Sequence, residues 1–280
     1  MYTLGLSCFL DHTEENFCNL QKYGFGAIEV TLRNELNDQT DYKNLLSLSK
    51  KYEVDLWSMH LPYCTVDISA GNAVEQQKTV FRIAESIKRG ADIGIDKFVM
   101  HPSVEPIDPS EREERKKRSM DSLNKLAEIA YDAGGVICVE NLPRTCLCNT
   151  TEETAEILTA NSKLKVCYDT NHLLNNDNVN FIKTFADKIV TIHVSDCDFI
   201  NERHWLPGEG KVNWPEVMAA LQEINYQGVF LYELRFQCPK TIIRDRDLTF
   251  SDLVENAKAL FAGKTPERFS LPKENLGVWE

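Results

Sequence analysis

Short, nearly continuous apolar runs alternate along the chain with longer segments whose apolar residues recur at helical spacing. Continuous apolar runs of this kind are typical of parallel strands that are buried on both faces. We therefore predict strands at residues 2–8, 27–32, 54–60, 97–101, 136–140, 165–169, 189–193 and 228–233.

The segments between these strands carry the signals of helices. Capping residues mark several starts, including Asp108 followed by Pro109, a capping box from Thr150 to Glu153, and Asn213 before Trp214. The predicted helices cover roughly residues 11–24, 40–52, 73–90, 108–132, 181–186, 213–225 and 249–262, with one more beginning at residue 150.

Eight repeats of strand and helix predict a closed (β/α)8 TIM barrel of α/β class, because successive right-handed βα units close on themselves. The expected organisation is one domain over residues 1–262 and a C-terminal tail over residues 263–280. An open doubly wound sheet would need a glycine-rich phosphate turn after the first strand, and residues 7–10 read Ser-Cys-Phe-Leu. Gly263-Lys-Thr fails as a P-loop because position 258 is lysine.

Composition narrows the classes of partner. The 280-residue chain has a formal net charge of −12, which disfavours nucleic acid because an acidic surface repels phosphate. No apolar run approaches the roughly 20 residues that a membrane helix needs. The first residues lack a basic leader and the cysteine count of nine is odd, so we expect a cytoplasmic protein with reduced thiols.

Cys146 and Cys148, the one close pair, are expected to be structural. The mixed charge run at residues 111–118 is expected to be a solvated helix face.

Imidazoles and carboxylates stand where the predicted strands end. The carboxyl ends of barrel strands converge on one mouth, so these residues should meet although they are far apart in sequence. The strand-end set comprises His60, His101, Glu140, Asp169, His193 and Glu233. Just beyond strand ends lie His172 and His204, and the segment 193–210 adds Asp196, Asp198 and Glu202. His12 stands apart and is expected to be a surface or capping residue.

Such a concentration of charged groups beside apolar strands would be costly unless they are paired or bind metal. Divalent metals favour these ligands, and the natural inner set is Glu140, Asp169, His193 and Glu233. Two carboxylates on opposite sides of a substrate, Glu140 and Glu233, can remove a proton from one face and return it to the other. A metal that polarises a carbonyl then suits isomerisation or epimerisation of a sugar.

The motifs that carry this set resemble the xylose isomerase-like TIM-barrel superfamily, in particular its branch of sugar phosphate isomerases and epimerases. They are HLPY at 60–63, HPS at 101–103, ENLPR at 140–144, DTNH at 169–172, HVSD at 193–196, ERHWLPGEG at 202–210 and YELR at 232–235. The resemblance implies Mn, Zn, Mg or Co on Glu140, Asp169, His193 and Glu233. It implies that Glu140 and Glu233 are the acid and base, and that His172 and Arg203 contact substrate hydroxyls.

A second branch, endonuclease IV, resembles the chain at a wider set of positions. They are His60, His101, Glu140, Asp169, His172, His193, His204 and Glu233. Its DRH motif appears here as Glu202-Arg203-His204, with an acid one carbon longer at the third metal. Three zinc ions would suit cleavage of a phosphodiester at an abasic site in DNA. The acidity of the chain argues against this activity. A barrel that binds a sugar or a metal without chemistry is the third alternative.

The expected partner is a small sugar or sugar phosphate, and nucleic acid and membranes are not expected. Arginines and a lysine near the predicted mouth are candidates for binding one phosphate: Arg144, Arg203, Lys211 and Arg235. Arg235 would share a strand face with Glu233 if that strand continued. His60, His101, His172, Glu202, Arg203, His204 and Arg235 are therefore predicted to bind substrate or additional metal. Homo-oligomerisation, common among sugar isomerases, is a further expectation.

Overall fold

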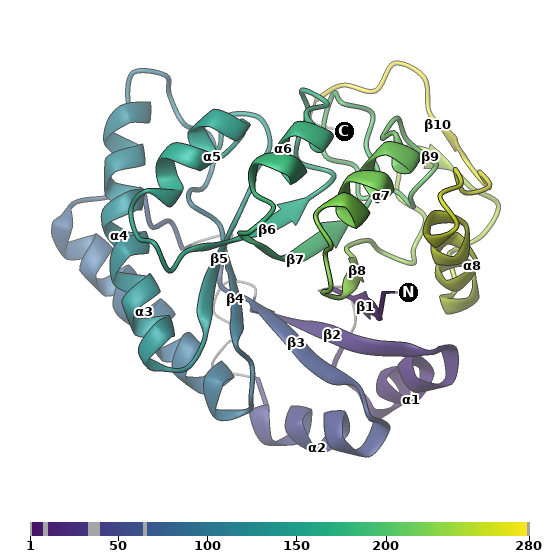
Figure 1. The fold of residues 1–280 in the computed structure, drawn as a ribbon, viewed down its shortest axis with the longest axis horizontal. Coiled ribbons are helices and arrows are strands. Elements are labelled where there is room, and N and C mark those ends of the chain that lie inside the picture. The colour runs from purple at the N-terminus through teal and green to yellow at the C-terminus, as the bar shows by residue number, and fades with distance from the viewer. Residues whose placement is uncertain (1, 8–10, 33–39, 64–65, 279–280) are drawn as a thin grey trace.

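Eight parallel strands form a closed barrel in the order β1 to β8, and helices cover its outside (Figure 1). The computed structural model describes residues 2–7, 11–32, 40–63 and 66–278. The barrel strands are β1 (Leu4–Leu6), β2 (Phe25–Thr31), β3 (Asp55–His60), β4 (Lys97–Met100), β5 (Val136–Glu140), β6 (Lys165–Asp169), β7 (Ile189–Val194) and β8 (Phe230–Tyr232). The helices are α1 (Glu14–Tyr23), α2 (Tyr42–Tyr52), α3 (Ala73–Asp92), α4 (Arg112–Asp132), α5 (Thr151–Leu158), α6 (Asn178–Thr184), α7 (Trp214–Glu223) and α8 (Phe250–Phe261). The predicted (β/α)8 barrel is confirmed.

Several predicted boundaries are wrong. The first strand is shorter than residues 2–8, and Cys8 lies outside the described residues. The fourth helix starts at Arg112 because the Asp108 carboxylate accepts the Ser110 N–H and closes a turn instead of capping the helix. The short helix α6 runs from 178 to 184 instead of 181 to 186. Thr150 caps α5, but Glu153 does not complete the predicted box.

The charge run at the start of α4 is less solvated than expected. Arg115 is nearly buried and pairs with Asp67 at 2.5 Å. Lys116 is nearly buried between Glu113 and Glu156, and Arg112 pairs with Glu153 on α5. The run therefore joins α4 to its neighbours instead of facing only water.

The segment after α8 returns toward the barrel mouth. Residues Leu271–Pro272 (β10) pair antiparallel with Ile242–Ile243 (β9), which lie in the segment after β8 (Figure 1). The Arg268 guanidinium donates to the carbonyls of Gly208 and Gly210, both 3.1 Å away. The predicted tail is thus fastened to loops that follow β7 and β8.

Two further observations bear on the expectations from composition. None of the described helices combines the length and the apolar character needed to cross a membrane. All seven described cysteines have free thiols, and Cys146 and Cys148 are buried. Burial raises the pKa of the Cys146 thiol to about 12, so this thiol is protonated at neutral pH.

Candidate active site

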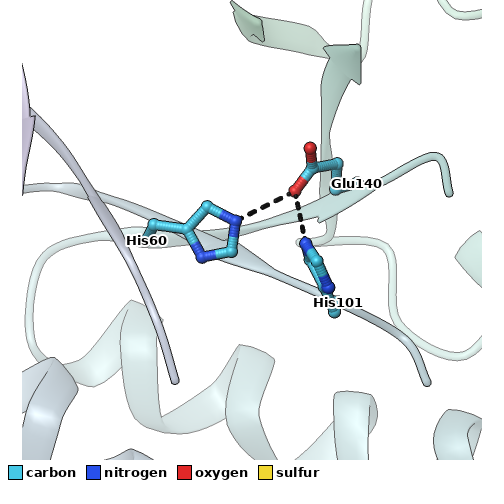
Figure 2. Close-up of side chains that lie close together, drawn as sticks. All are labelled: His60, His101 and Glu140. Atoms are coloured by element: carbon cyan, nitrogen blue, oxygen red, sulfur yellow. Dashed lines mark hydrogen bonds and ion pairs between the residues drawn. The ribbon is translucent and has the colours of Figure 1, made fainter. Parts of the chain in front are cut away.

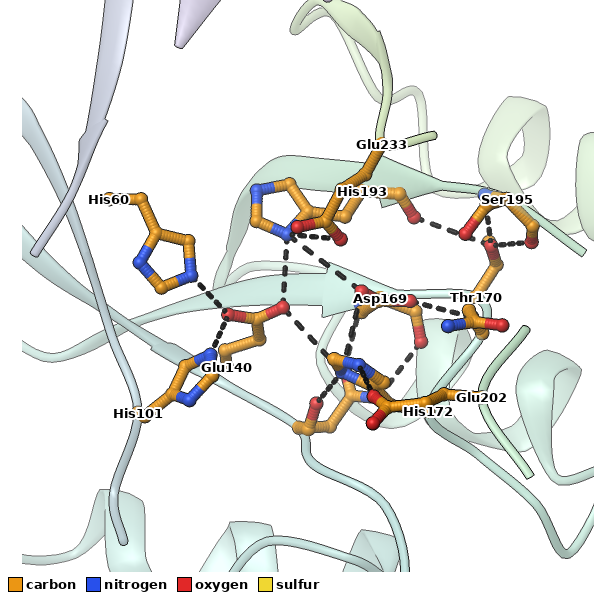
Figure 3. A network of polar contacts seen from close by, with 12 residues as sticks. His60, His101, Glu140, Asp169, Thr170, His172, His193, Ser195, Glu202 and Glu233 are labelled. Carbon is orange, nitrogen blue, oxygen red and sulfur yellow. Dashed lines mark hydrogen bonds and ion pairs between the residues drawn. The ribbon is translucent and has the colours of Figure 1, made fainter. Parts of the chain in front are cut away.

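The strand register places the predicted ligands side by side at one end of the barrel. Asp169 on β6 is aligned with His193 on β7, and Glu140 ends β5 on the neighbouring side. Glu233 follows β8 directly and donates its N–H to the Val194 carbonyl at 3.0 Å. One ligand atom from each of these four side chains lies within 4.8 Å of the others. Figure 3 shows them converging.

His193 is the centre of this group. Its Nδ1 lies 2.9 Å from Glu140 Oε1, 3.3 Å from Glu233 Oε2 and 3.8 Å from Asp169 Oδ2. The Oδ2 of Asp169 is buried and accepts no hydrogen bond within the described structure. One imidazole nitrogen and three carboxylates, with a buried oxygen left to satisfy, fit a hard or borderline divalent metal.

A second donor group adjoins the first through Glu140. His60 Nε2 and His101 Nε2 lie 3.2 and 3.0 Å from Glu140 Oε2, as Figure 2 shows. The other oxygen, Oε1, faces His193. Each oxygen of one carboxylate therefore belongs to a different cluster of donors, the arrangement of a bridging ligand.

A third donor group consists of His172, Glu202 and His204. Glu202 Oε2 lies 2.9 Å from His172 Nε2 and 4.0 Å from His204 Nε2. The longer acid at position 202 therefore reaches both histidines. Its other oxygen accepts from Arg144 at 2.7 Å.

The outer nitrogens of three of these histidines are held by backbone carbonyls. His60 Nδ1 contacts Leu61 O at 3.0 Å, His172 Nδ1 contacts Asn141 O at 2.9 Å and His204 Nδ1 contacts Glu233 O at 3.1 Å. A carbonyl only accepts, so each Nδ1 carries the proton. Each Nε2 then faces the carboxylates, to which it donates when the ring is protonated, and it would offer its lone pair to a cation bound between them.

The sequence reasoning missed Glu29, which lies behind His193. This residue on β2 is 2% exposed, and both its oxygens are 3.2 Å from His193 Nε2. The only sequence signal for Glu29 was that it is a single acid inside the apolar run 27–32. His12 is only partly exposed, lies just before the Thr13 cap of α1 and belongs to none of the donor groups among the described residues.

The electrostatics of the four central residues follow from burial and proximity. Burial alone would raise the pKa values of Glu140 and Glu233, but nearby histidines, above all His193, hold both pKa values well below the usual range. Burial raises the pKa of Asp169 well above its usual value. The glutamates are therefore ionised at neutral pH, which suits metal ligands and proton acceptors.

A cavity of about 360 Å³ opens above the donor groups, a size suited to a small molecule. It is lined by His60, Tyr63, His101, Ser103, Val104, Glu105, Leu142, Pro143, Arg144, Cys146, His172, Glu202, His204 and Glu233. Among the lining residues that the structure describes, Arg144 is the only arginine or lysine, and it is engaged by Glu105 and Glu202.

Two predicted site residues lie elsewhere. Arg203 donates to Asp198 Oδ2 at 2.9 Å and to Gly277 O at 2.8 Å, so its side chain points to the C-terminal segment and not to the cavity. Strand β8 ends at Tyr232, before Glu233. Arg235 therefore does not share a strand face with Glu233, and it is exposed and outside the cavity lining.

The family model described as xylose isomerase-like TIM barrel matches residues 17–250. The chain belongs to this family. The predicted resemblance is confirmed at the level of the family and its fold.

Individual relatives and solved structures extend the comparison. MJ1311, an uncharacterised protein of Methanocaldococcus jannaschii, is 28% identical over 68% of each chain. The crystal structure of a D-tagatose 3-epimerase-like protein is 24% identical, with a TM-score of 0.79 over 94% of this chain and 97% of the other. The crystal structure of a D-psicose 3-epimerase is 21% identical, with a TM-score of 0.74 over 94% of this chain and 97% of the other. At these identities the solved structures establish the fold.

Proposed function

We propose that this protein is a divalent-metal-dependent isomerase or epimerase of a small sugar or sugar phosphate. The observation that carries the proposal is the pair Glu140 and Glu233, which flank His193 and Asp169 at the floor of a cavity of small-molecule size. The epimerases with a similar fold support the same class of reaction.

The metal part of the proposal rests on the donor set. Glu140, Asp169, His193 and Glu233 would hold one Mn, Zn, Mg or Co ion, which would polarise the substrate carbonyl and lower the pKa of the adjacent C–H. The Asp169 Oδ2 that accepts no hydrogen bond fits this role, because a metal would compensate its burial.

The side chains divide the remaining work. Glu233 lines the cavity and would accept the carbon-bound proton. Glu140 is fully buried on the other side of His193 and would deliver or receive the proton at the opposite face. His60, His101 and His172 line the cavity and would bind substrate hydroxyls through their ring nitrogens.

The test is exchange of the carbon-bound proton with solvent. We expect Glu233→Gln to abolish substrate-dependent exchange of this proton into deuterated water, because an amide cannot accept it. Nuclear magnetic resonance of a panel of ketoses and aldoses, with and without phosphate, measures the exchange rate.

The control for this variant is Glu255→Gln, which neutralises an exposed acid paired with Lys258 far from the donor groups. It should retain the wild-type rate, and circular dichroism should show that both variants are folded. Undiminished exchange in Glu233→Gln would mean that Glu233 is not the proton acceptor. Absence of exchange in the wild type for every sugar tested would refute the proposed reaction.

A second candidate is a trinuclear zinc phosphodiesterase similar to endonuclease IV. It is favoured by one observation, namely that three donor groups, linked through Glu140 and Glu233, occur together in the described structure. Against it, the described part of the cavity lining offers one arginine, which is already engaged by two carboxylates, and this is unfavourable for binding a DNA backbone.

Metal content and cleavage separate the two candidates. About one equivalent of metal per chain, measured by elemental mass spectrometry on untagged protein, favours the isomerase with His60, His101 and His204 as substrate contacts. Nearly three equivalents of zinc, together with cleavage of an abasic-site duplex that Glu140→Gln lacks, favours the phosphodiesterase. Binding of sugars without turnover in any assay would instead indicate a non-catalytic barrel.

A further inference from the structure

The buried carboxylate of Glu29 has protein hydrogen-bond partners for both of its oxygens. Its Oε1 accepts from Ser7 Oγ and its Oε2 from Ser58 Oγ, both at 2.8 Å, and the two serines come from the strands on either side of β2 or just beyond them. The remaining partner of the carboxylate is His193 Nε2, 3.2 Å from each oxygen. Glu29, Ser7 and Ser58 are all buried.

The hydrogen-bond surroundings of His193 differ from those of His60, His172 and His204 in which ring nitrogen faces the donor groups and in what holds the other nitrogen. His60, His172 and His204 place Nδ1 on a backbone carbonyl and direct Nε2 toward the carboxylates. His193 has the reverse orientation, with Nδ1 toward Glu140 and Nε2 toward a buried carboxylate. With a cation on Nδ1, the proton of the neutral ring has to lie on Nε2, and Glu29, which only accepts, is the group that receives it.

We propose that Glu29 is a positioning residue that sets the affinity of the barrel for a divalent ion by fixing the orientation and tautomer of His193. A carboxylate behind a metal-bound imidazole also makes the facing nitrogen a better donor. Glu29 is not itself a ligand, because the imidazole ring separates it from Glu140, Asp169 and Glu233 and it belongs to none of the donor groups in the described structure.

The cost of the arrangement supports a functional reason for it. A buried carboxylate is expensive, and a serine pair could be satisfied by a neutral amide. The site also already contains three carboxylates, so a fourth nearby charge adds repulsion in the absence of metal. These costs are offset when a cation occupies the group around His193.

The experiment measures binding of Co²⁺ to metal-free protein, by visible absorption and by competition with a chromophoric chelator. We expect Glu29→Gln to weaken binding about 10–100-fold and to change the absorption bands, because His193 loses the anionic acceptor that orients it. Ser58→Ala, which removes one support of the carboxylate, should weaken binding by a smaller factor and serves if Glu29→Gln does not fold.

The matched control is Glu153→Gln, which neutralises another nearly buried glutamate. Glu153 pairs with Arg112 at 2.6 Å and lies outside the donor groups. It should bind Co²⁺ within about twofold of wild type. A folded Glu29→Gln variant with the affinity and spectrum of wild type would overturn the inference, as would wild-type protein that binds no Co²⁺. The inference rests on the metal site of the proposed function but is measured without turnover, so failure of the proposed reaction would leave it standing.

Discussion

Asp196 lies three residues beyond His193 and acts as a structural hub instead of a metal ligand. Its Oδ1 accepts from the N–H of Cys197 at 2.9 Å and of Val212 at 3.0 Å. Its Oδ2 accepts from the Gly208 N–H and from the Trp214 indole, both at 2.8 Å. The loop after β7, which carries Glu202 and His204, is therefore held in place from within.

We predict that Asp196→Asn lowers the free energy of unfolding by about 1–3 kcal/mol, because the amide group replaces one acceptor and leaves buried donors unsatisfied. Urea unfolding followed by tryptophan fluorescence measures the change. Asp245→Asn, at an exposed position, is the control and should change stability by less than about 0.5 kcal/mol. An equally small effect at position 196 would contradict the structural role.

At the level of single residues, the sequence was sufficient to predict the histidines and acids that lie at strand ends. It could not identify Glu29, because one acid inside an apolar strand has no visible partner until His193 is placed beside it. Arg203 was predicted near the substrate from the family resemblance, and Arg235 from its place two residues past Glu233 on a strand assumed to continue. The direction of a side chain on a loop depends on backbone angles that local sequence does not determine.

Helix α8 begins with a complete capping box. The Thr249 hydroxyl accepts from the Asp252 N–H, and the Asp252 carboxylate accepts from the Thr249 N–H at 2.7 Å. The Arg246 guanidinium forms two contacts with the same carboxylate, at 2.6 and 2.7 Å. Hydrogen bonding to Arg246, only partly opposed by burial, lowers the pKa of Asp252 to about 2.

This shift predicts a loss of stability in acid. A carboxyl whose pKa is depressed by folding contributes stability above its unfolded pKa, near 3.8, and the contribution disappears as the pH falls toward about 2. Thermal unfolding measured between pH 5 and pH 2 should therefore decline less steeply for Asp252→Asn than for wild type. Parallel curves for the two proteins would show that the capping carboxylate does not titrate as stated.

At the level of elements, strands were predicted more accurately than helix starts. A continuous apolar run has few alternatives once both faces are covered, so β5 and β6 match their predicted ranges. Helix starts depend on which of several nearby polar residues binds the first N–H groups. Asp108 closes a turn instead, and α4 begins without a side-chain cap.

The molecule gathers buried acids at one end of its barrel. Three buried carboxylates surround His193, and a fourth, Glu29, lies behind it. Binding of a cation to the native state alone should therefore stabilise the fold as a whole.

We predict that a divalent ion at 100 times its dissociation constant raises the free energy of unfolding by about 2.7 kcal/mol. This corresponds to a rise in Tm of roughly 4–6 °C for a chain of this size. Differential scanning calorimetry of metal-free and reloaded protein measures it. Glu140→Gln, which removes a carboxylate shared by three groups of potential ligands, should abolish the rise, whereas an equal rise in that variant would place the ion elsewhere.

At the scale of the molecule, the convergence of the site was predictable because barrel closure brings strand ends together wherever they lie in sequence. That argument placed His60, His101, Glu140, Asp169, His193 and Glu233 correctly relative to one another. It did not extend to the segment after α8, whose pairing with β9 has no periodic signal in a stretch of two residues.

Arg144 joins three loops that are distant in sequence. It contacts Glu105 after β4, lies itself after β5, and contacts Glu202 after β7. These loops cannot separate without breaking ion pairs, so this side of the cavity is already shaped before a ligand arrives. A ligand should then bind with little entropy lost in ordering these loops. Calorimetry should show a heat-capacity change that matches the surface buried between ligand and cavity, with no added contribution from folding of the loops.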